Sequence, residues 1–136
     1  MHFALAFAVS VALTEAAGIL GGRDRLERFG STLVLLGTAA VVLAVATGYL
    51  AANTAPGLVE GVESAALDRH ERFALLGAGS LLLAVVWKGL GGGRIAPGQR
   101  RVYALALIVV AALLLWAALL GGTLVYELGV GVTAPG

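Results

Sequence analysis

The chain has 136 residues, of which 60% are hydrophobic and 12% are charged, whereas a typical soluble domain carries about 25% charged residues. Too few polar side chains are present to cover a soluble fold, so the composition indicates an integral membrane protein. At about 20 residues per span, four membrane helices use nearly the whole length and leave no room for a soluble catalytic domain. The absence of cysteine excludes disulfides, iron–sulfur clusters and c-type haem, and a net charge of +1 does not indicate nucleic-acid binding.

Four apolar runs, separated by polar or glycine-rich breaks, follow one another along the chain. No basic residue precedes the first run, which favours a retained helix over a cleaved signal peptide. None of the runs alternates in the manner of a barrel strand, so helices are the only spanning structure expected. We therefore predict an all-α integral membrane four-helix up-down bundle that forms a single domain. The predicted helices are 3–21, 29–50, 70–90 and 102–125, followed by a glycine-rich flexible tail at 127–136.

The basic residues are distributed unevenly among the connections. Seven of the nine lie in the first and third connections or at the helix ends beside them, and the other two, Arg69 and Arg72, lie in the second. The positive-inside rule then predicts a multi-pass protein of the bacterial inner (cytoplasmic) membrane with both termini outside. The seven are Arg23, Arg25, Arg28, Lys88, Arg94, Arg100 and Arg101.

The chain has only two histidines, His2 and His70, and each opens a predicted helix. The first and third helices of an up-down bundle start on the same side of the membrane and are diagonal neighbours. Both imidazoles are therefore expected near the outer boundary of the apolar layer, facing each other across the core. Such a pair can supply the two axial ligands of a b-type haem, so His2 and His70 are the predicted metal ligands.

Small and basic residues at the predicted depth of the histidines extend this hypothesis. Gly48 on the second helix and Gly122 on the fourth would let a flat macrocycle approach the backbone closely. Arg69 and Arg72, which flank His70, are suited to pair with haem propionates. The alternative is an interfacial histidine beside glycines that serve only helix packing, because small residues are common at membrane helix interfaces.

Glu15 is an acidic residue well inside the first predicted helix. An ionised carboxylate at such a depth costs about 2.5–3.5 kcal/mol on insertion scales, so we expect it to be buried between helices, with a hydroxyl or an arginine of the first connection as partner. A contact to a proton pathway or a quinol is the alternative. Glu15 lies roughly 20 Å from His2 along the helix, too far to ligate the same centre.

Two segments resemble a bacterial family of four-helix membrane proteins catalogued only as a domain of unknown function. Residues 1–6, MHFALA, are similar to that family's His-Phe-Pro-x-Ala opening, with Ala4 in place of the usual proline. Residues 121–132, GGTLVYELGVGV, resemble its closing Gly-Gly-x-Leu-Val-Tyr and Gly-Val-Gly-Val motif. Thr-Gly-Tyr at 47–49 and the histidine that opens the third helix match further family positions. The resemblance implies the four-helix fold and an association with respiratory or cytochrome components, but no established activity.

Three functions remain open on this basis. The first is a small non-enzymatic b-type cytochrome-like subunit that passes electrons at the outer membrane face through a bis-histidine haem b. The second is a non-catalytic accessory subunit of a respiratory or photosynthetic complex that binds lipid or pigment, since a chlorophyll-type pigment needs only one histidine. The third, a transporter or quinone-binding protein built around Glu15, is disfavoured because no span is interrupted to form a substrate site. Membrane lipid and the subunits of a larger redox or photosynthetic complex are the expected partners.

Overall fold

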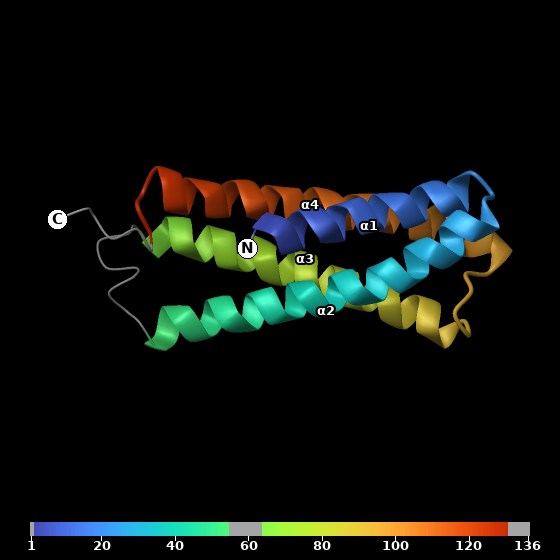
Figure 1. Cartoon of the computed structure of the whole chain (residues 1–136), viewed down its shortest axis with the longest axis horizontal. Coiled ribbons are helices and arrows are strands. Elements are labelled where there is room, and N and C mark those ends of the chain that lie inside the picture. The colour runs from blue at the N-terminus through green and yellow to red at the C-terminus, as the bar shows by residue number, and fades with distance from the viewer. Residues whose placement is uncertain (1, 55–63, 131–136) are drawn as a thin grey trace.

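The structure is a computed structural model that describes residues 2–54 and 64–130. A few side chains at helix ends, that of His2 among them, lie outside this description. The described chain forms four long helices that run up and down in turn (Figure 1), which confirms the predicted all-α helical bundle. They are α1 (His2–Leu20), α2 (Asp24–Thr54), α3 (Ser64–Leu90) and α4 (Arg100–Tyr126), with a short 3-10 turn, η2 (Pro97–Gln99), before α4.

Three of the helices are long and apolar enough to cross a membrane. These spans are Asp24–Ala51, Ala65–Leu90 and Pro97–Tyr126. The described apolar stretch of α1, Ala8–Leu20, is shorter, although the whole 19-residue helix has a length of about 28 Å, close to the roughly 30 Å of a bilayer core. Many large hydrophobic side chains point outward from the bundle, as expected of surfaces that face lipid.

The helices extend beyond the apolar runs that predict them. The second begins at Asp24 rather than at 29, because Asp24 and Glu27 in its first turn favour the positive end of the helix dipole. The third begins at Ser64 rather than at 70, so the charged residues before His70 lie on the helix itself. Apolarity marks the part of a helix that lies in lipid, and these helices continue past that part into polar sequence. The predicted tail falls largely outside the description, which ends at residue 130.

The helix α1 forms the centre of the packing. It packs closely against α2 and α4, and α4 packs against α3, whereas α2 and α3 touch only slightly. Within residues 2–54 and 64–130 the backbones of α1 and α3 do not come into contact, so these two helices are diagonal, as the up-down topology requires. Ala8, Ala12 and Ala16 on α1 are fully or almost fully buried, and their small side chains let the neighbouring backbones approach.

A glycine on α2 sets how closely α1 and α2 approach. A methyl group added at Gly30 would lie 2.8 Å from the Cα of Glu15, a distance at which backbone would have to move. The two helices therefore approach closely beside the acidic residue of α1. Because these two elements meet there, Glu15 is placed in the interior rather than toward lipid.

Candidate functional site

A buried ion pair joins α1 to α3 near one end of the bundle. Glu15 is 0% exposed and Lys88 is 7% exposed, and the Lys88 ammonium donates hydrogen bonds to Glu15 Oε1 and to the hydroxyl oxygen of Ser31 on α2. Ser31 Oγ itself lies 3.3 Å from Glu15 Oε1. This confirms the expectation that Glu15 is buried between helices with a hydroxyl partner. The basic partner is Lys88 rather than an arginine of the first connection.

Glu15, Lys88 and Ser31 form a buried polar cluster. Two interior oxygen atoms in or beside this cluster have no hydrogen-bond partner among the described residues. They are Glu15 Oε2 and the hydroxyl of Tyr103 on α4. The Lys88 ammonium lies 6.0 Å from the centre of the Tyr103 ring, and Trp87 packs edge-on against the same ring with centroids 5.6 Å apart. The cluster thus connects all four helices through polar or aromatic contacts.

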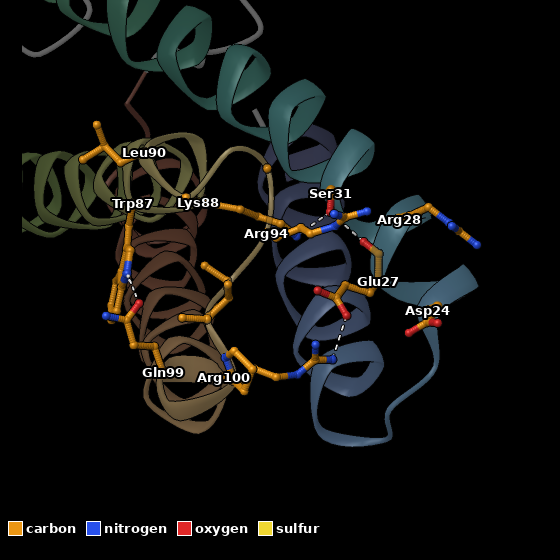
Figure 2. Close-up of a pocket in the computed structure, with 15 residues that line it drawn as sticks. Asp24, Glu27, Arg28, Ser31, Trp87, Lys88, Leu90, Arg94, Gln99 and Arg100 are labelled. Carbon is orange, nitrogen blue, oxygen red and sulfur yellow. Dashed lines mark hydrogen bonds and ion pairs between the residues drawn. The ribbon is translucent and has the colours of Figure 1, made fainter.

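The ion pair borders a hollow at the end of the bundle where the α1–α2 and α3–α4 connections lie, which we call the basic end. This hollow has a volume of about 740 Å³. Figure 2 shows the Lys88 side chain reaching from α3 toward Ser31 on α2, and the Arg100 guanidinium reaching from α4 to Glu27. The Arg100–Glu27 pair has an N–O distance of 2.7 Å. Charged side chains of α3 and α4 therefore both reach across the hollow to α2.

His70 lies on α3 toward the opposite end of the bundle, where it is half-buried against α4. Its Nδ1 atom is 3.0 Å from the carbonyl oxygen of Ala117. A carbonyl only accepts hydrogen bonds, so Nδ1 must carry the proton and the neutral ring has its lone pair on Nε2. No hydrogen bond to Nε2 is formed by any residue in the described ranges.

The glycine that contacts His70 is Gly121. A methyl group at Gly121 would lie 2.9 Å from His70 Cε1, so the ring occupies space that only glycine leaves open. One turn further along α3, Phe73 packs edge-on against Trp116 of α4 with centroids 6.4 Å apart. The hydrogen bond to Ala117 and the close contact with Gly121 hold the His70 ring of α3 against α4.

The other sequence-predicted residues are placed as follows. His2 is the first residue of α1, and its side chain lies outside the description. Gly48 is partly exposed on α2, and Gly122 has no neighbour within 4 Å of the position a side chain would take. Arg69 and Arg72 are exposed on α3, and the Arg69 Nε donates to the carbonyl of Ala65 at 3.1 Å.

The depths of the two histidines can be compared by counting residues from the ion pair. His2 lies 13 residues from Glu15 and His70 lies 18 residues from Lys88, or about 20 Å and 27 Å at 1.5 Å per residue. By this count α1 starts about 7 Å nearer the basic end than His70, and Figure 1 shows α1 starting part-way along α3. The equal depth expected from the sequence differs from this arrangement because more helical residues separate His70 from Lys88 than separate His2 from Glu15.

The sequence did not lead to Lys88 as the partner of Glu15, and it led to Gly122 rather than the adjacent Gly121 at the level of His70. Lys88 could have been found from the sequence, because Glu15 near the end of one apolar run and Lys88 near the end of another fall at the same side of the membrane. No comparable signal existed for Gly121, because the choice between adjacent glycines depends on the rotation of α4 about its axis.

Comparison with known proteins identifies the family. The model of a family of predicted membrane proteins, DUF2231, matches residues 1–134, nearly the whole chain. No curated protein and no solved structure matches it. The chain belongs to this family, which confirms the resemblance drawn from its opening and closing motifs.

Proposed function

We propose that this member of the DUF2231 membrane protein family is a small b-type cytochrome-like subunit in which His70 and His2 hold a haem b and pass single electrons. The observation that carries the proposal is the orientation of His70, whose Nδ1 donates to the Ala117 carbonyl and whose Nε2 remains available. Metal-ligating histidines characteristically donate their second ring nitrogen to a carbonyl or carboxylate in this manner.

The metal-ligating side chains of the described residues suit a haem better than most other metal centres. No group of three or more histidine, aspartate or glutamate side chains lies close enough to hold a metal ion within the described residues, whereas a haem iron needs only one or two axial ligands from the protein. His2 is the other histidine of the chain and lies on the helix diagonal to that of His70. When bound by two histidines, haem supplies one-electron transfer and has no open position for a substrate.

The two histidines differ in how firmly they are held, which supports unequal roles. His70 is fixed by a hydrogen bond and by contact with Gly121, whereas His2 is the first residue of its helix, where helices fray. We therefore infer that His70 is the dominant ligand. The exposed Arg69 and Arg72 beside it remain the proposed partners of the haem propionates.

The test is a reduced-minus-oxidised absorption spectrum of the purified protein after expression with adequate haem. The wild type should show a low-spin b-type spectrum, His70→Ala should lose it or retain a high-spin remnant, and His2→Ala should retain part of it with a displaced band. Glu71→Gln, an exposed change next to His70, is the matched control and should match the wild type. A wild-type protein without haem would overturn the proposal in favour of an accessory subunit that binds lipid or pigment in a larger redox or photosynthetic complex.

A further inference from the structure

We propose that the hollow at the basic end binds the phosphate of an anionic glycerophospholipid headgroup. Fifteen residues line this hollow, of which four are cationic and two are acidic. The cationic residues are Arg28, Lys88, Arg94 and Arg100, and the acidic residues are Asp24 and Glu27. The proposal does not depend on haem, because the two sites lie toward opposite ends of the bundle.

Two of the four cations form no ion pair in the part of the chain that the structure describes. Lys88 is paired with Glu15, and Arg100 is paired with Glu27. Arg28 and Arg94 form no ion pair with any residue of the described ranges. Because a guanidinium binds phosphate oxygens through two parallel hydrogen bonds, these two arginines supply the donors that a phosphate requires.

The helix that starts at the hollow adds further positive potential. The residues that lead into α4 line it, and Gln99, the residue before α4, makes no side-chain cap to the first turn. The N-terminal amides of a helix carry a partial positive charge and are suited to bind anions. The hollow is therefore positive both in its side chains and in the helix end that borders it.

The position of the hollow favours a lipid over a soluble anion. The apolar span of α3 ends at Leu90 and that of α4 begins at Pro97, and both residues line the hollow. The hollow thus lies where spans end, which is the depth of lipid phosphates. Leu90 is 86% exposed and offers an apolar contact to the chains of a lipid whose headgroup occupies the hollow. Basic pockets between membrane helices at this depth characteristically bind anionic headgroups.

The experiment measures lipid retention by the full chain in detergent, using native mass spectrometry with dioleoyl phosphatidylglycerol, dioleoyl phosphatidylcholine or sodium phosphate as the probe. We expect phosphatidylglycerol to bind at least about fivefold more tightly than phosphatidylcholine, and Arg94→Gln or Arg28→Gln to weaken it about fivefold each. Arg101→Gln removes the same charge from an exposed residue that does not line the hollow, so it should change binding less than twofold.

Three outcomes would overturn the proposal. Equal weakening by Arg94→Gln and Arg101→Gln would show a diffuse charge effect rather than a site. Equal binding of the two lipids would show that the charge of the hollow is not recognised. Displacement of phosphatidylglycerol by millimolar sodium phosphate would assign the hollow to a soluble anion. An unchanged unfolding midpoint for Arg94→Gln, which alters an exposed side chain, keeps a loss of binding distinct from a loss of fold.

Discussion

Replacing Gly121 by alanine tests the contact that holds His70, and the neighbouring Gly122 provides a matched control. The added methyl group at Gly121 would lie 2.9 Å from His70 Cε1 and 3.3 Å from Nδ1, whereas the same group at Gly122 meets nothing within 4 Å. Both changes place an alanine at adjacent positions of α4, so the gain in helix propensity of up to about 1 kcal/mol is common to both variants. The difference between the two variants therefore isolates the displacement of the imidazole.

The magnitude follows from what the methyl group displaces. The atom that it meets is the far end of a side chain, so the ring can move, but its hydrogen bond to Ala117 is then lost or lengthened. Such a bond contributes about 0.5–1.5 kcal/mol. We expect Gly121→Ala to be less stable than Gly122→Ala by that amount, which corresponds to a difference of roughly 2–5 °C in the midpoint of thermal unfolding.

The assay is thermal unfolding of both variants in the same detergent, followed by the haem spectrum. If His70 is the dominant ligand, Gly121→Ala should also bind less haem than Gly122→Ala, since Nε2 moves with the ring. Equal midpoints together with equal haem content would refute the assigned packing of His70 on α4. A difference in midpoint, with no haem in either variant or in the wild type, would leave the packing correct and remove the cytochrome proposal.

The remaining predictions concern the ion pair, the helix crossing and the orientation. Lys88→Met should destabilise the protein by about 3–5 kcal/mol because it leaves Glu15 buried without its charge partner. Adding Glu15→Gln to this variant should restore most of the lost stability. A double variant as unstable as Lys88→Met would contradict the assigned ion pair. Glu15→Gln alone should leave the haem spectrum unchanged, because the residue is far from both histidines. Gly30→Val should destabilise by about 1–3 kcal/mol by forcing α1 away from α2, whereas Gly79→Val, which meets nothing within 4 Å, should not. A reporter fused to the C-terminus should be active outside the cytoplasm, and activity only inside would reverse the proposed orientation.

The fold could be predicted from the sequence because the membrane imposes the pattern. Runs of apolar residues long enough to span lipid can only be helices, and the intervening polar breaks then fix their number and order. The ends of the helices could not be predicted in this way. The segment around Asp68 is polar and was assigned to a connection, yet it is helical, because a helix that leaves the membrane no longer needs apolar side chains.

The site was predictable as a set of unusual residues but not as a set of contacts. His70 and Glu15 stand out in the sequence because polar residues in apolar runs are expensive. Their partners depend on how far each helix is rotated and shifted along its axis. Gly121 rather than Gly122 faces His70, a difference of one residue that corresponds to about 100° of helix rotation and leaves no trace in composition.

The arrangement of the four helices gives the two ends of the bundle different properties. Toward the basic end, the close approach of α1 and α2 at Gly30 and the ion pair of Glu15 with Lys88 join the helices tightly. By residue count, α1 starts about 7 Å nearer the basic end than His70, and α2 and α3 touch only slightly. Within residues 2–54 and 64–130, the position diagonal to His70 is therefore not filled by a helix at that depth. The proposed haem would lie in this region, with the Nε2 atom of His70 as its ligand.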